Sequence, residues 1–156
     1  MIEVHERVHR SLQELVEHCG DLGPGDLNRE LPGFGYPTVR LQLHHVIGAE
    51  EYWVGVLQGR VEADENDAAY PTTAALEAYR RRVGTATAAY LGAVAAEELN
   101  TPRPMRTWGG RERVLVPAHV ILRTMMHVYH HLGQVAAMCR LLGRPTEGRD
   151  LNYPTA

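Results

Sequence analysis

Clusters of glycine and proline divide this chain into four long segments, and this division limits most strongly what the chain can fold into. The clusters lie at 20–25, 32–35, 70–71, 102–110 and 143–145. Proline lacks a backbone donor and glycine leaves helical geometry readily, so such clusters end helices. Between the clusters, apolar residues recur every three or four positions, which is the period of an amphipathic helix.

Each of the four segments is long enough to cross a small domain. The expected helices run from about Ile2 to Cys19, from near Pro37 to about Leu57, from Thr72 or Thr73 to about Leu99, and from Pro117 to just before Gly143. At ~1.5 Å per residue, the last helix is roughly 39 Å long. Residues 100–113 fit a short hairpin or an ordered loop equally well. The sequence therefore predicts an all-α four-helix bundle with a hairpin or loop before the last helix.

Size and composition narrow the class of protein. The 156 residues suit a single domain spanning 1–156. A net charge of −3 gives no reason to expect nucleic acid, and the basic run Arg80 to Arg82 is expected on a solvated face. No run of about 18 apolar residues predicts a membrane span, and the charged N-terminus does not resemble a signal peptide, so we expect a cytoplasmic protein. Cys19 and Cys139 form no metal or disulfide spacing and are expected in the core.

The last helical segment carries two histidines, His127 and His131, four residues apart. Positions i and i+4 share one helix face, ~6 Å apart at Cβ, so both imidazoles can reach a single ion. Histidines also cap helices and occupy surfaces, so the pair alone is a weak indication of metal. A metal site needs a third ligand from another segment.

The second helix offers the adjacent pair His44 and His45. Neighbouring helical residues point about 100° apart, so only one of the two can face a shared centre. We favour His45, because Leu41, Ala49 and Tyr52 lie on its stripe, and we expect His44 to face another helix or solvent. Spacing alone is equally compatible with His45 as a hydrogen-bonded core histidine.

The other histidines receive no ligand role. His5 and His9 are also four residues apart, but charged neighbours near the terminus predict a solvated face for them. His18 suits the C-terminal end of a helix dipole, His119 lies in the first turn of the last helix, and His130 is rotated away from His127.

A di-iron carboxylate centre is a different use of a helical bundle. Such a centre needs two Glu-x-x-His motifs, and the chain contains none, because Glu14 and His18 are one residue too far apart. The sequence thus argues against a two-metal centre of this type.

Three segments resemble the DinB-like (YfiT-like) superfamily of bacterial four-helix-bundle metalloproteins. Residues 41–53, LQLHHVIGAEEYW, are similar to the family's second-helix pattern of a ligand histidine followed by Ala-Glu and an aromatic residue. Residues 127–134, HVYHHLGQ, look like its H-x-x-x-H-[R]-G-Q signature, and residues 143–156, GRPTEGRDLNYPTA, look like the tail of many members. The resemblance covers nearly the whole chain and departs at Leu132, where members commonly carry arginine.

The resemblance implies a DinB/YfiT-type bundle in which His45, His127 and His131 bind one divalent ion, zinc or nickel, with water completing the shell. Three neutral imidazoles with an open position are typical of catalytic rather than structural zinc sites. Because ligand histidines usually donate their second N–H to an oxygen, the candidate partners are Gln134, Glu50, Tyr52 and Tyr129.

Three functions follow from such a site. Some branches of the family transfer low-molecular-weight thiols, such as mycothiol or bacillithiol, and the first hypothesis is an enzyme that activates such a thiol for S-transfer to a small electrophile. The second is a hydrolase that uses metal-bound hydroxide. The third is a non-catalytic stress protein that binds a metal or small ligand. The resemblance also implies a homodimer, while the sequence identifies neither the substrate nor any catalytic residue beyond the proposed ligands.

Overall fold

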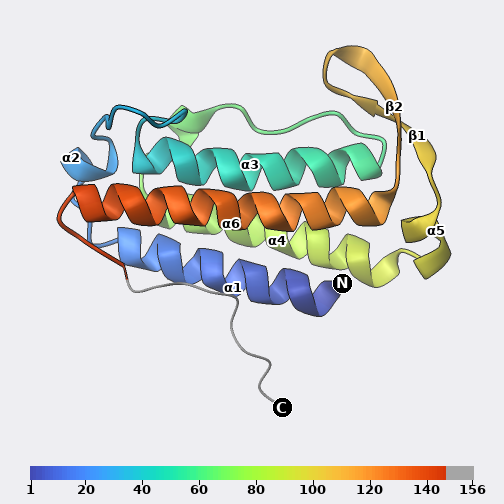
Figure 1. Cartoon of the computed structure of the whole chain (residues 1–156), viewed down its shortest axis with the longest axis horizontal. Coiled ribbons are helices and arrows are strands. Elements are labelled where there is room, and N and C mark those ends of the chain that lie inside the picture. Colours follow the sequence, from blue (N-terminus) through green and yellow to red (C-terminus); the bar gives the residue numbers. More distant parts are fainter. Residues whose placement is uncertain (147–156) are drawn as a thin grey trace.

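The computed structural model describes residues 1–146 and consists mainly of helices. The four long helices are α1 (Ile2–Cys19), α3 (Val39–Leu57), α4 (Thr73–Ala93) and α6 (Pro117–Leu141). Short helices α2 (Pro24–Leu27) and α5 (Ala96–Asn100) and the strands β1 (Arg103–Thr107) and β2 (Arg111–Leu115) lie between them, with 3₁₀ turns at Asp67–Ala69 and Trp108–Gly110. The all-helical bundle predicted from the sequence is therefore confirmed, with a hairpin before the last helix (Figure 1).

Threonine side chains fix the beginnings of α3 and α4. Thr38 Oγ1 accepts a hydrogen bond from the Leu41 amide at 3.1 Å, and Thr72 Oγ1 accepts one from the Ala75 amide at 3.2 Å. Such N-cap bonds satisfy amides that have no partner within the helix. The cap at Thr72 was predicted, whereas α3 begins two residues later than the expected start at Pro37.

The third helix ends earlier than the expected position at Leu99. Val94 and Ala95 adopt extended backbone angles, with ψ of 134° and 146°, and α5 begins after them. Glu97 and Glu98 lie in the first turn of α5, where a negative charge interacts favourably with the helix dipole. Two helices therefore replace the single expected one, and the chain turns towards the hairpin.

The four long helices form a closed ring around the core. Helix α3 packs on α4 and α6, and α1 packs on the same two helices, so α1 and α3 lie diagonally opposite each other. Figure 1 shows α3 and α6 running antiparallel side by side, whereas α3 and α4 run in the same direction. The connection from α3 to α4 consequently has to return along the whole bundle.

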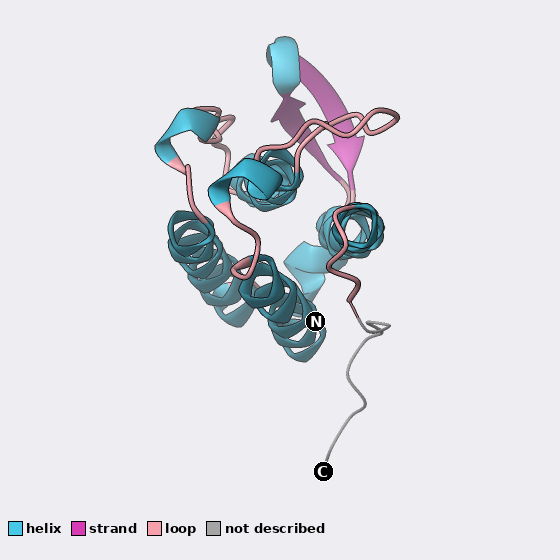
Figure 2. Ribbon diagram, turned by 90° about the vertical axis from the view of Figure 1, so that its left-hand side faces the viewer, coloured by secondary structure: helices cyan, strands magenta, loops and turns pink. Residues whose placement is uncertain are grey.

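The hairpin stands outside this ring (Figure 2). Strands β1 and β2 pair antiparallel, with Thr107 opposite Arg111. Gly109 and Gly110 make the turn with φ of 67° and 72°, a backbone conformation that favours glycine. The Trp108 amide donates a hydrogen bond to the Tyr52 hydroxyl at 2.6 Å, which fastens the hairpin to α3.

The core follows the apolar stripes of the helices, and both cysteines lie within it. Cys19 and Cys139 are fully buried, as expected, with their Sγ atoms 3.8 Å apart. No helix among residues 1–146 has the length and apolar character needed to cross a membrane.

Candidate metal centre

Three histidines from two helices meet beside the cleft between α3 and α6. The ring centroid of His45 lies 5.1 Å from that of His127 and 4.8 Å from that of His131, and the latter two lie 4.4 Å apart. The rings are inclined to one another by 67° to 73°. One nitrogen of each ring lies within 4.8 Å of the other two, so the three lone pairs can reach one point.

Helix packing creates this arrangement. His127 and His131 lie one turn apart on α6, and the antiparallel contact with α3 brings His45 opposite both. Tyr36, in the loop before α3, stacks on the His45 ring at 4.0 Å between centroids. The His44 ring lies against Tyr79 of α4 at 5.6 Å between centroids, so the structure brings His45 rather than His44 to the pair.

A buried glutamine orients His131. Gln42 Oε1 lies 2.6 Å from His131 Nδ1, while Gln42 Nε2 donates to Gln134 Oε1 at 2.8 Å and to the Tyr36 carbonyl at 3.1 Å. Since both amide protons are directed at acceptors, Oε1 accepts and His131 Nδ1 carries a proton. The neutral ring therefore offers its Nε2 lone pair, which lies 3.0 Å from His127 Nε2.

The environment keeps these imidazoles neutral. Burial lowers the pKa of His127 to about 4, and the positive charges of His45 and Arg123 act in the same direction. Burial together with the neighbouring histidines lowers the pKa of His131 to about 3. The pKa of His45 is also lowered, by burial and then by His44. Neutral imidazoles are the form that binds metal ions, and nitrogens bonded to one ion at ~2.1 Å lie roughly 3 to 3.5 Å apart.

The four residues that were expected to accept hydrogen bonds from the ligand histidines contact other groups instead. Gln134 contacts Gln42, and Gln42, which was not among the expected partners, contacts His131. The Tyr52 hydroxyl holds the hairpin, and the Tyr129 hydroxyl lies 3.1 Å from Ser11 Oγ of α1. Glu50 points into the core and forms hydrogen bonds with His5 and His9, which were not expected to be buried.

The solvated face predicted for His5 and His9 is wrong. Both side chains are buried, with 4% and 7% of their surface exposed, and their Nε2 atoms lie 2.9 and 2.7 Å from the two oxygens of Glu50. Burial alone would raise the pKa of Glu50, but the hydrogen bonds from the two histidines hold its pKa well below the ordinary value. This buried cluster therefore joins α1 to α3 through a carboxylate.

His5, His9 and Glu50 also have the composition of a metal site, since their ligand atoms lie within 4.8 Å of one another. Arg80 argues against a metal there. Its Nη1 lies 3.2 Å from His9 Nδ1, and because arginine can only donate, Nδ1 accepts and the proton of the neutral ring resides on Nε2. His9 Nε2 thus donates to Glu50 and has no lone pair for an ion. Arg80 is itself buried, so the predicted solvated face holds only for Arg81 and Arg82.

Two of the three converging histidines border an open cleft of about 440 Å³, which we call the histidine cleft. His45 and His127 line it, whereas His131 is buried behind them. Aromatic side chains and the loop after α3 complete the walls, including Tyr36, Tyr52, Trp53, Trp108, Asp64 and Glu65. A ligand of an ion held by the three histidines can approach through this opening.

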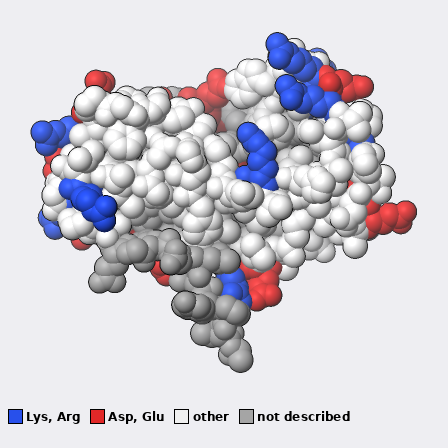
Figure 3. All heavy atoms as spheres, viewed as in Figure 1, with Lys and Arg blue, Asp and Glu red and all other residues white. Residues whose placement is uncertain are grey.

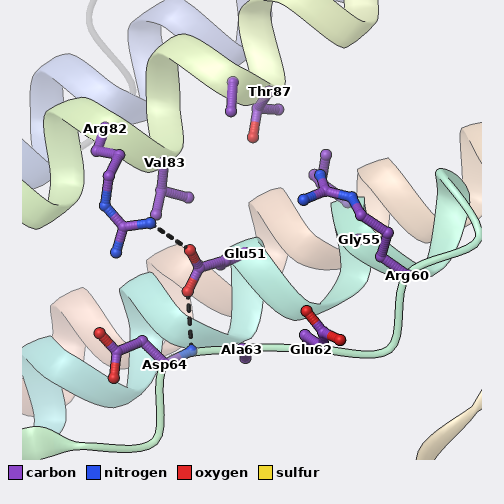
Figure 4. Close-up of a pocket in the computed structure, with 11 residues that line it drawn as sticks. Glu51, Gly55, Arg60, Glu62, Ala63, Asp64, Arg82, Val83 and Thr87 are labelled. Carbon is purple, nitrogen blue, oxygen red and sulfur yellow. Dashed lines mark hydrogen bonds and ion pairs between the residues drawn. The ribbon is translucent and has the colours of Figure 1, made fainter.

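A second hollow, with a volume of about 370 Å³, lies between α3, α4 and the loop that follows α3 (Figure 4). Contacts inside this hollow hold the loop in place. Glu51 lies at the centre of the hollow and pairs with Arg82 at 2.6 Å. The other Glu51 oxygen accepts hydrogen bonds from the Asp64 amide at 3.0 Å and from the Tyr79 hydroxyl at 2.7 Å. Both oxygens are therefore engaged, and this carboxylate fixes the wall of the histidine cleft.

The sequence model of the DinB family matches residues 3–155. The chain belongs to the DinB family. Among solved structures, the crystal structure of a DinB-like protein from Bacillus cereus ATCC 10987 superposes with a TM-score of 0.74, covering 93% of this chain and 92% of that chain at 19% sequence identity. This similarity supports the DinB-like fold. No curated protein matches the chain. Of the closing segment that resembles the family's tail, residues 147–156 lie outside the described residues.

Proposed function

We propose that His45, His127 and His131 bind one divalent ion, zinc or nickel, and that the protein uses it to activate a low-molecular-weight thiol for transfer to a small electrophile. The observation that carries the proposal is the convergence of three neutral imidazoles at an open cleft, with His131 oriented by Gln42. The cleft volume of about 440 Å³ suits a small molecule.

An ion held there would keep a bound thiol in its thiolate form, which is the nucleophilic form. The chain itself would orient the ligands and shape the approach to them. Gln42 fixes the ring of His131, Tyr36 stacks on His45, and the aromatic wall of Tyr52 and Trp53 positions the electrophile. In the transfer, the sulfur forms a bond to carbon, the leaving group departs with its electron pair, and the thiol proton goes to solvent.

The two carboxylates that follow His45 on α3 offer no free base to the hydrolase hypothesis. Within residues 1–146, Glu50 and Glu51, which follow His45 on α3, have both carboxylate oxygens engaged. Cys19 and Cys139 are fully buried and do not line the cleft, so the nucleophilic sulfur would come from a separate small molecule.

Metal content and thiol dependence test the proposal directly. Elemental analysis is expected to give about one ion per chain, and His127→Ala is expected to abolish binding. With a chromogenic aryl halide as electrophile, turnover should require both the ion and an added thiol. His18→Ala is the matched control, since His18 lies at the far end of α1 and contacts only the Arg144 carbonyl among the described hydrogen bonds. Metal retained by His127→Ala would overturn the site, and turnover independent of thiol would overturn the reaction.

The cytoplasmic location and the homodimer belong to this proposal as predictions. A reducing compartment supplies low-molecular-weight thiols, which agrees with the expected location. Sedimentation of the purified protein measures the oligomeric state.

A further inference from the structure

The histidine cleft continues into a second, larger groove beneath the hairpin. This hairpin groove has a volume of about 850 Å³ and lies between α6, α3 and the two strands. Tyr52, Trp53, Trp108 and Arg123 line both spaces, so the histidine cleft and the hairpin groove adjoin along α3 and α6. A ligand at the histidines therefore has room to extend along α6 towards the hairpin.

Positive charge is concentrated along this extension. Three arginines, Arg111, Arg113 and Arg123, line the hairpin groove, and no Asp or Glu of the described chain lines it. None of the three guanidinium groups lies within 4.0 Å of a carboxylate of residues 1–146. Because the chain contains no lysine, the blue atoms in Figure 3 are arginine; one group of them lies over the hairpin at the upper right, and others lie near the centre, at the lower edge and at the left-hand end of the face.

Arg123 stands at the junction of the two spaces. It precedes His127 by one helical turn, and its charge contributes to the lowered pKa of that imidazole after burial and His45. Its guanidinium lies over the Trp53 ring, 5.1 Å from the centroid, which orients the group without neutralising it. Asp64 and Glu65 line the histidine cleft, whereas the described residues that line the hairpin groove include no acid.

The walls beside these cations are apolar. Trp108 and Val114 have 59% and 72% of their surface exposed, and the groove between them also includes Leu115 and Val116. Exposed apolar surface combined with unpaired cations complements a molecule with an aromatic or aliphatic body and an anionic group.

We propose that the hairpin groove is a binding site for an organic anion with an aromatic or aliphatic body, whose anionic group is bound by Arg123 with the support of Arg111 and Arg113. This inference rests on the proposed function in one respect, since it assigns the substrate class of the same site. The anionic group points towards the hairpin, and the opposite end of the molecule lies at the histidines.

The two tryptophans of the chain provide the assay, because both Trp53 and Trp108 line the groove. Quenching of their fluorescence is titrated with 4-nitrobenzoate and with 4-nitrobenzamide, a neutral probe of nearly the same shape. Folded, chelator-treated protein is used, so that a carboxylate cannot bind to an ion at the histidines. We expect the benzoate to bind about tenfold more tightly than the benzamide, and Arg123→Gln to remove this difference. Arg140→Gln, an exposed arginine in the last turn of α6, should leave it unchanged.

Equal affinities for the two probes would overturn the inference, as would full benzoate affinity in Arg123→Gln. The metal content of Arg123→Gln is measured in parallel and is expected to equal that of the wild type. Charge selectivity in a protein that binds no ion would refute the proposed function and leave the anion site standing. A bound ion without charge selectivity would refute the anion site alone.

Discussion

Replacing Gln42 by leucine tests whether the hydrogen bond behind His131 contributes to metal binding. The side chain is fully buried, and its Oε1 lies 2.6 Å from His131 Nδ1. Leucine has a similar volume but offers no acceptor, so the His131 ring loses the group that fixes its orientation and tautomer. Partners of this kind typically contribute 10- to 100-fold to metal affinity, which is about 1.4 to 2.7 kcal/mol.

The same substitution also weakens the fold, because it leaves a buried N–H without an acceptor. This costs about 1 to 3 kcal/mol in the free energy of unfolding, measured by urea denaturation of the metal-free protein. Affinity is measured at pH 7 by competition with a chromophoric chelator. The two measurements together separate loss of orientation from loss of stability.

Glu50→Gln is the matched control for this experiment. It perturbs a second buried hydrogen-bonded group on α3, one that contacts His5 and His9 and no proposed ligand. We expect it to lower the free energy of unfolding by about 2 kcal/mol, since two charge-assisted bonds become neutral ones, and to leave metal affinity unchanged. The reasoning is refuted if Gln42→Leu folds and binds metal as tightly as the wild type.

Three further outcomes follow from the same contacts. Two ordinary imidazoles with a pKa of 6.5 would weaken metal binding about six-hundredfold between pH 7 and pH 5. Because the pKa values of His127 and His131 are lowered to about 4 and about 3, chelator competition should show a loss of less than about tenfold. The lowered pKa of Glu50 stabilises the fold at pH values above the unfolded-state pKa of about 4.3, and this contribution is lost as the pH falls below that pKa. In urea titrations, the free energy of unfolding of the wild type should therefore fall more between pH 5 and pH 3 than that of Glu50→Gln. Tyr52→Phe removes the acceptor of the Trp108 amide, and hydrogen exchange of that amide should accelerate while metal content stays the same.

The long helices could be predicted because their apolar periodicity persists over many turns. The end of α4 could not, because alanine-rich sequence around Val94 favours helix on both sides of the break. The extended pair at Val94 and Ala95 depends on where the hairpin has to begin, which is a tertiary requirement. For residues 100–113 the sequence left hairpin and loop open, and the paired strands decide for the hairpin.

For the histidines, too, only part of the arrangement could be predicted from the sequence. Their i, i+4 spacing and the resemblance brought His127 and His131 together with His45, and the structure places the three rings side by side. His5 and His9 were placed on the surface because of their charged neighbours. Their alignment with the buried stripe of α1 was a signal for the opposite conclusion.

Two hydrogen-bond partners of buried histidines could not be predicted from the sequence. Glu50 and Gln42 act across helices, and their contacts depend on which helices are neighbours in the ring. A polar Gln42 one turn before His45, between Leu41 and Leu43, was nonetheless a hint. Such a residue is buried at a cost unless its polar atoms find partners.

The parallel course of α3 and α4 has a consequence for how this protein can diversify. The 19 residues of α3 span about 28 Å, and residues 58–72 return over this length outside the ring, as Figure 1 shows. On the way, this crossover supplies Asp64 and Glu65 to the histidine cleft. A stretch that the topology requires thus forms one wall of the site. Substitution of its exposed residues, such as Glu65, can alter ligand preference while the bundle keeps its stability.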